Sequence, residues 1–336
     1  MYLLIWTFIF VTSLFVLVKA SDYFVRSAEK IGFYMRISPF IIGVTILAIG
    51  TSLPELFSSV FAVLMGSSEI VLGNVIGSNI TNIFLILGLS AVVGGKMKTT
   101  YDLVHVDLPL FVGSAFLLAM TIWDGKFSLL EALLCLTCLI IYILYVANAE
   151  KYTLDEAETL RCSNLPVGVS MSGLQFHNEN DNSMLKAEIK AKTYIILLLS
   201  LIFIYVGANY TLISIIRLSE ALDIGVEIMA TSAVALGTSL PELVVSTSAA
   251  SKGKPELAIG TVMGSNIFNA LGIVGISALF GSLVVPELVL NFALPVMLVA
   301  TMLYFVIIWE KETTKWEGAM LIIFYIFFLG KLFSVL

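Results

Sequence analysis

Two identical segments, each reading Gly-Thr-Ser-Leu-Pro-Glu, place one glutamate apiece inside an apolar stretch of this chain. The glutamates are Glu55 and Glu242, and each lies near the middle of a run long enough to cross a bilayer. An ionised carboxylate at that depth costs at least about 2.5 kcal/mol, so it normally serves an ion or proton pathway. Two of them at equivalent positions of a repeat therefore favour a buried cation site over simple packing.

Oxygen-bearing groups surround both carboxylates. Pro54 and Pro241 stand directly before the glutamates and lack the N–H that a helix needs, so each predicts a break in its helix. We expect the breaks to free backbone carbonyls, which need new partners in hydrocarbon. The oxygens near the breaks belong to Ala48, Thr51, Ser52, Ala235, Thr238 and Ser239. Hard cations such as Na⁺ and Ca²⁺ take mixed oxygen ligands of this kind, and no histidine or thiolate nearby indicates zinc or copper.

A second repeated segment adds hydroxyl and amide groups. Residues 73–82 reappear as residues 260–269, at the same offset of 187 that relates the two glutamates. In each copy a serine and an asparagine stand four residues apart and share a helix face. They are Ser78 with Asn82, and Ser265 with Asn269. Because Gly-x-x-x-Gly spacing lets another backbone approach closely, we expect four helices to enclose one oxygen-lined site.

Membrane-spanning helices must position these groups. Of the 336 residues, 59% are hydrophobic and only 12% are charged, whereas a soluble domain is about one quarter charged. The apolar runs are continuous, which excludes the alternating pattern of a β-barrel. The sequence thus predicts an all-α membrane protein. Its ten transmembrane helices are predicted at residues 2–20, 38–65, 69–93, 103–123, 127–147, 193–216, 225–250, 256–280, 288–309 and 316–335.

The ten helices divide into two repeats. Five helices per half is an odd number, so the second copy must enter the membrane from the opposite side, as in many secondary transporters. We therefore predict two inverted five-helix repeats in which helices 2 and 7 are broken. The repeats are residues 1–147 and 192–336, and residues 148–191 form a polar linker between them.

Basic residues indicate the orientation. Odd-numbered loops share one side of the membrane and carry 15 of the 18 lysines and arginines. Because cytoplasmic loops are enriched in these residues, we expect a multi-pass protein of the cell membrane. Both termini would lie outside, and the linker would lie in the cytoplasm.

The paired segments resemble the α-repeats of the calcium/cation antiporter superfamily, and especially those of prokaryotic sodium/calcium exchangers. The resemblance implies a secondary active antiporter that exchanges Na⁺ for Ca²⁺ by alternating access at a midplane site. It implies Ca²⁺ binding by Glu55, Glu242, Thr51 and Thr238. It implies one Na⁺ site at Ser52, Ala235, Ser265, Glu55 and Thr238, and a mirror-image site at Ala48, Ser78, Ser239, Thr51 and Glu242. Asn82 and Asn269 would flank the centre.

Asn269 bears on the choice of ions. Some family members, including the potassium-dependent exchangers, carry aspartate there, so asparagine makes a potassium step unexpected. The Gly-Thr-Ser-Leu-Pro-Glu motif also differs from the Gly-Asn-x-x-Glu motif that proton/calcium exchangers generally carry. Both features favour Na⁺ as the counter-ion.

Other functions stay open at this stage. A proton/calcium antiporter could use the same glutamates, because burial favours their protonated form. A cation channel is a different class, and the repeats and broken helices favour a transporter over a ring-like pore. No constellation of an intramembrane enzyme occurs, so we expect no catalysis and no cofactor beyond the transported ions. We expect the lipid bilayer as partner, no nucleic acid and no obligatory protein partner.

Overall fold

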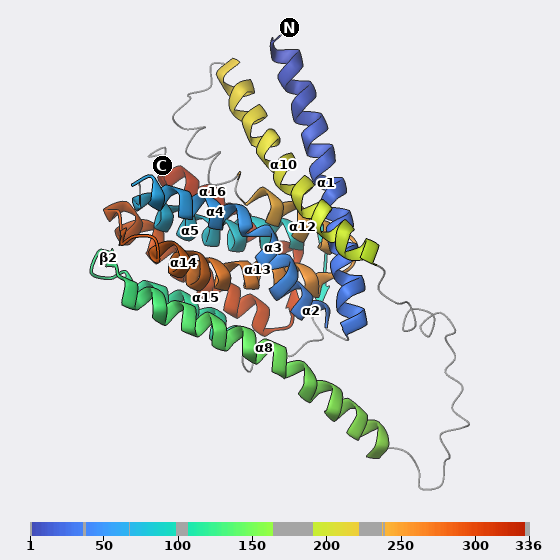
Figure 1. The fold of residues 1–336 in the computed structure, drawn as a ribbon. Coiled ribbons are helices and arrows are strands. Elements are labelled where there is room, and N and C mark those ends of the chain that lie inside the picture. The colour runs from blue at the N-terminus through green and yellow to red at the C-terminus, as the bar shows by residue number, and fades with distance from the viewer. Residues whose placement is uncertain are drawn as a thin grey trace.

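The structure is a computed structural model that describes residues 2–35, 38–66, 68–98, 107–163, 191–221, 237 and 239–332 (Figure 1). Within these residues the chain is almost entirely helical. Five helical stretches are long and apolar enough to cross a bilayer, or six if a bent pair counts as one span. They are Leu3–Gly32, Glu69–Gly94, Leu129–Val146, Pro255–Ala278 and Val289–Trp309, with Pro39–Thr51 plus Leu53–Leu64 as the bent pair.

The first half contains α1 (Tyr2–Met35), α2 (Pro39–Ile42), η1 (Gly43–Leu47), α3 (Ala48–Thr51), α4 (Leu53–Leu64), α5 (Glu69–Thr81), η2 (Asn82–Leu87), α6 (Gly88–Gly94), β1 (Met97–Lys98), α7 (Asp107–Thr121), β2 (Lys126–Phe127) and α8 (Leu129–Ser163). The second contains α10 (Ala191–Ala221), α12 (Leu240–Ser251), α13 (Pro255–Ile267), η4 (Phe268–Ile273), α14 (Val274–Ala278), β3 (Leu283–Val284), η5 (Val289–Ala293), α15 (Leu294–Trp309), β4 (Glu312–Thr313) and α16 (Lys315–Leu332). The elements labelled η are π-helical turns.

Two helices are longer than the predicted spans. α1 continues from the predicted end at residue 20 to Met35, because apolar residues keep helical spacing there and bury Phe24, Val25 and Ala28. α8 continues to Ser163, into residues that the sequence assigns to the linker. An uninterrupted apolar run therefore locates the span but not the end of its helix.

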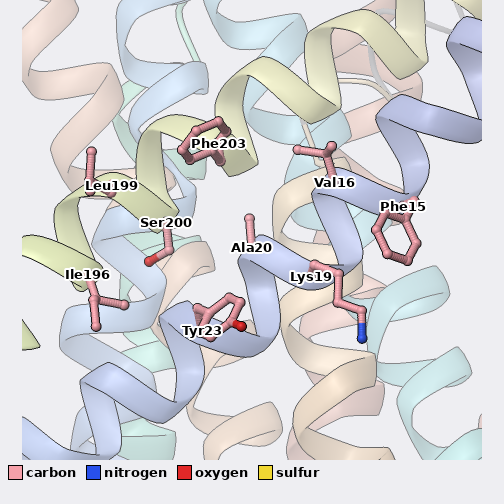
Figure 2. Close-up of a pocket in the computed structure, with 9 residues that line it drawn as sticks. All are labelled: Phe15, Val16, Lys19, Ala20, Tyr23, Ile196, Leu199, Ser200 and Phe203. Atoms are coloured by element: carbon pink, nitrogen blue, oxygen red, sulfur yellow. The ribbon is translucent and has the colours of Figure 1, made fainter.

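α1 and α10 pack side by side and project beyond the other helices (Figure 1). A shallow apolar groove of about 380 Å³ lies between them, with Phe15 and Tyr23 on one side and Phe203 on the other (Figure 2). The C-terminal half of α1 is tied to the second half of the chain by ion pairs of Asp22 with Lys252 and of Glu29 with Lys254.

Two short antiparallel strand pairs connect the halves. β1 pairs with β4, with Met97 opposite Thr313, and β2 pairs with β3, with Lys126 opposite Val284. The offset of 187 relates Met97 to Val284 and Lys126 to Thr313, so each strand pair is the counterpart of the other in the repeat. β3 precedes and β4 follows the continuous helix η5–α15, so the two strand pairs lie at opposite ends of that helix.

Candidate cation site

Similar backbone turns at Ser52 and Ser239 place the paired glutamates. Helix α3 ends and α4 begins at Ser52, where the axis bends by 41°. Ser52 has φ −84° and ψ 4°, and its counterpart Ser239 has φ −90° and ψ 5°. In both copies the proline occupies the first turn of the next helix, where its missing N–H is tolerated, and the glutamate follows in that same turn. The sequence therefore predicted the break correctly, and both copies have the same backbone conformation at the serine.

Both glutamates are buried, and the two motifs meet. Glu55 is 1% exposed and Glu242 is 2% exposed. The Ser52 hydroxyl donates a hydrogen bond of 3.0 Å to Glu242 Oε1, although the two residues belong to different halves. Helix α4 also packs against η4, and α12 packs against η2. The four predicted helices thus come together around the carboxylates.

The Ala48 carbonyl differs from the prediction. We expected the break to free it, but its oxygen accepts the Ser52 N–H at 3.1 Å and the Ser265 hydroxyl at 3.5 Å. The expectation is wrong because the missing donor is that of Pro54, whose partner four residues earlier would be Gly50. The contact with Ser265 nevertheless joins α3 to α13.

Close backbone packing holds α13 against α2 and η1. A Cβ at Gly260 would lie 2.5 Å from the Phe40 carbonyl oxygen, and one at Gly264 would collide with the Val44 carbonyl oxygen. A Cβ at Gly43 would lie 2.7 Å from the Leu257 carbonyl oxygen. The second Gly-x-x-x-Gly segment therefore makes the close helix contact that the sequence predicted.

Asparagines from α5–η2 and α13–η4 interlock beside the glutamates. Asn82 Nδ2 donates to Asn266 Oδ1 at 3.0 Å, and Asn269 Nδ2 donates to Asn79 Oδ1 at 3.1 Å. Asn79 and Asn266 are 3% exposed, and we did not identify them from the sequence. The signal was present, because both lie in the repeated segment and are related by the offset of 187.

Several buried oxygens have no hydrogen-bond partner among the described residues. Burying a polar atom without a partner costs roughly 1–3 kcal/mol, so such atoms are rare in folded proteins. Five of them belong to candidate ligands in the two repeated motifs, namely Glu242 Oε2, Ser78 Oγ, Ser239 Oγ, Asn82 Oδ1 and Asn269 Oδ1. Others belong to residues outside the candidate set, namely Asn74 Oδ1, Ser90 Oγ, Ser246 Oγ, Ser277 Oγ and Thr313 Oγ1. The five oxygens on the candidate ligands are of the kind that a hard cation prefers.

Two candidate ligands, Ala235 and Thr238, lie outside the described residues. Thr51 is fully buried, and its hydroxyl bonds back to the Leu47 carbonyl at 3.0 Å. In the described part of the chain, no three histidine, cysteine, aspartate or glutamate side chains cluster as a metal site. Any cation held here would therefore be bound by two carboxylates and neutral oxygens.

Comparison with known proteins agrees with this geometry. The chain matches the family described as "Sodium/calcium exchanger protein" over residues 5–148 and 192–333. It is 38% identical to the sodium/calcium exchanger MaX1 of Methanosarcina acetivorans, over 95% of this chain and 96% of that protein. It is 30% identical to the uncharacterised membrane protein MJ0091 of Methanocaldococcus jannaschii, over 96% of each.

Solved structures of the sodium–calcium exchanger NCX_Mj share the fold. One, soaked with 2.5 mM Na⁺ and 1 mM Sr²⁺, superposes with a TM-score of 0.77 at 28% identity and covers 96% of each chain. Another, soaked without Na⁺ and Ca²⁺, gives a TM-score of 0.79 over 98% of this chain and 99% of that one. The similarity thus extends over nearly the whole length of both proteins.

Proposed function

The chain belongs to the sodium/calcium exchanger family, and from that premise we propose that it exchanges Na⁺ for Ca²⁺ at one buried site between its halves. The observation that carries the proposal is the group of unpartnered buried oxygens on the paired motifs. Family membership favours Na⁺ over H⁺ as the counter-ion. It also makes the protein a transporter rather than an enzyme.

We assign the ions to the residues predicted from the sequence. Glu55 and Glu242, with Thr51 and Thr238, would bind Ca²⁺. Na⁺ would use the same glutamates and threonines with Ala48, Ser52, Ser78, Ala235, Ser239 and Ser265, and Asn82 and Asn269 would flank the centre. The hydrogen bond from Ser52 to Glu242 supports a single shared cage, because it joins a ligand of one proposed Na⁺ set to the carboxylate of the other.

Charge balance would couple the two fluxes. Two ionised carboxylates neutralise one Ca²⁺, or nearly neutralise a small group of Na⁺ ions. A loaded site can therefore change its access from one side to the other without two uncompensated charges in a low dielectric. The empty, doubly ionised site resists that change, and alternating access with competing ions follows. If more than two Na⁺ replace one Ca²⁺, transport responds to the membrane potential.

We also propose ten transmembrane helices in two inverted repeats, with both termini outside the cell membrane and residues 148–191 in the cytoplasm. The offset of 187 residues supports this arrangement. It relates the residues of the strand pair β1–β4 to those of the pair β2–β3, which lies at the opposite end of η5–α15. It also converts the bond between Asn82 and Asn266 into that between Asn269 and Asn79. Such exchange is what a two-fold axis in the membrane plane produces.

Uptake of ⁴⁵Ca²⁺ into liposomes tests the proposal. With Na⁺ inside and Ca²⁺ outside, the purified protein should accumulate Ca²⁺ as Na⁺ leaves. An imposed proton gradient without Na⁺ should drive no uptake. Uptake driven only by protons would contradict the Na⁺ assignment.

Glutamine variants test the site in the same assay. Glu55→Gln and Glu242→Gln should each abolish exchange, because one carboxylate no longer balances the cation charge. Glu69→Gln makes the same chemical change at an exposed carboxylate of α5 and should leave uptake intact. Full activity in either buried variant would remove the carboxylates from the site.

A further inference from the structure

Four buried asparagines link the two halves of the molecule next to the candidate ligands. Each is at most 3% exposed, and they come in pairs from opposite helices. Asn82 donates to the side chain of Asn266, and Asn269 donates to the side chain of Asn79. The two donors lie in the π-helical turns η2 and η4, which pack against the glutamate-bearing helices α12 and α4. π turns inside helices are often found at functional sites.

These bonds fix which way two amides face. A side-chain amide carries its donor NH₂ and its acceptor oxygen on opposite branches of one plane. Once the NH₂ of Asn82 or Asn269 is held by the opposite helix, its oxygen must point away from that helix. Both of these oxygens are buried and have no partner among the described residues. A cation is attracted by the oxygen and repelled by the NH₂, so amide orientation decides whether the residue helps or hinders binding.

We propose that Asn79 and Asn266 are positioning residues for ion binding, a role that rests on the proposed exchange function. Each accepts the amide hydrogen of the flanking asparagine on the other half and thereby leaves that asparagine's oxygen for the transported cation. Neither touches the ion itself. The arrangement also makes each half set the ligand geometry of the other.

The two accepting asparagines, Asn79 and Asn266, are not held equally firmly. Asn79 Nδ2 donates to the Asn266 backbone carbonyl at 3.3 Å, so its own side chain is held at both ends. Asn266 Nδ2 has no acceptor among the described residues. The orientation of Asn269, which depends on Asn79, is therefore the better fixed, and a change at Asn79 should have the larger effect.

Ca²⁺ dependence of Na⁺-driven uptake tests the inference. Asn79→Leu keeps the volume but removes the acceptor, so Asn269 can turn its NH₂ toward the cation. The KM for Ca²⁺ should rise about tenfold, the cost of one misplaced hydrogen-bonding group, with a smaller change in maximal rate. Asn79→Asp restores an acceptor oxygen and should bring the KM back to within about threefold of the wild type. Asn266→Leu should act in the same direction but less strongly.

A double-variant cycle separates positioning from general structure. Asn269→Ala removes the amide that Asn79 orients, so adding Asn79→Leu to it should raise the KM no further. Independent, additive effects of the two changes would overturn the inference, as would an unchanged KM in Asn79→Leu. If Asn79→Leu fails to fold, the cycle of Asn266→Leu with Asn82→Ala makes the same test. Exchange that persists in Glu55→Gln would instead contradict the proposed ion site, and a wild-type protein without Na⁺-driven uptake would contradict the proposed function.

Discussion

The two Gly-x-x-x-Gly segments have the same spacing, but only the second has its partner helix among the described residues. Gly260 and Gly264 are pressed against carbonyl oxygens of α2 and η1, and an added Cβ would collide at either position. An added Cβ at Gly77 meets no described atom within 4 Å, and one at Gly73 meets only the Val289 side chain at 3.8 Å. The offset of 187 converts positions 40 and 44 into positions 227 and 231, which lie outside the described residues. The close crossing on the α13 side is therefore the one that the described residues show.

The largest effect should follow from forcing this closed crossing apart. Gly264→Ala places a methyl group against the Val44 backbone, which cannot move as a flexible side chain can. We expect the free energy of unfolding to fall by about 1–3 kcal/mol, as for other overpacked sites, and exchange to slow. Thermal unfolding of the purified protein in detergent measures the first, and ⁴⁵Ca²⁺ uptake measures the second.

Gly113→Ala is the control for this change, because Gly113 is exposed in the interior of helix α7. The exposed position and the better helix propensity of alanine predict a neutral or slightly stabilising effect, of at most about 1 kcal/mol. Equal losses in the two variants would show that the close crossing at Gly264 is not what makes the added methyl group costly.

The serines at the two breaks should differ less. Ser52→Ala leaves Glu242 Oε1 without its hydroxyl donor, so without ions the variant should lose about 1 kcal/mol of unfolding free energy. Ser239→Ala removes a hydroxyl that has no described partner, so the change should stay within about 0.5 kcal/mol. Melting temperatures in ion-free buffer decide this, and a larger loss in Ser239→Ala would reverse the assignment.

The smallest effect concerns the two strand pairs. Only β1–β4, among the described residues, carries ion pairs, from Lys96 and Lys98 to Glu312. The hydrogen bond from Lys96 holds the pKa of the Glu312 carboxyl below its ordinary value of 4.5. A lowered carboxyl pKa stabilises the fold above that value, and the contribution is lost as the pH falls through the lowered pKa.

Glu312→Gln should remove this small pH dependence. Its melting temperature should fall less than that of the wild type between pH 7 and pH 4, while exchange at pH 7 stays unchanged. The partly exposed position of Glu312 keeps the effect slight. If the melting temperatures of the two proteins fall equally between pH 7 and pH 4, the ion pairs contribute nothing to stability.

The sequence predicted the positions of the buried glutamates better than the packing around them. Glu55, Glu242 and the breaks before them could be identified because proline and a midplane carboxylate have strong local effects. The repeat marks Asn79 and Asn266, but their hydrogen bonds could not be predicted, since the orientation of an amide depends on the opposite helix and on π turns that leave no clear sequence pattern. For the same reason the bonded Ala48 carbonyl could not be foreseen.

The central claim is that Glu55 and Glu242 form one site that Na⁺ and Ca²⁺ share. Equilibrium ⁴⁵Ca²⁺ binding to the purified protein, titrated with Na⁺, tests it directly. We predict one Ca²⁺ per chain, complete displacement by Na⁺, and loss of binding in both Glu55→Gln and Glu242→Gln. Ca²⁺ binding that Na⁺ cannot displace, or that survives in either variant, would contradict the account.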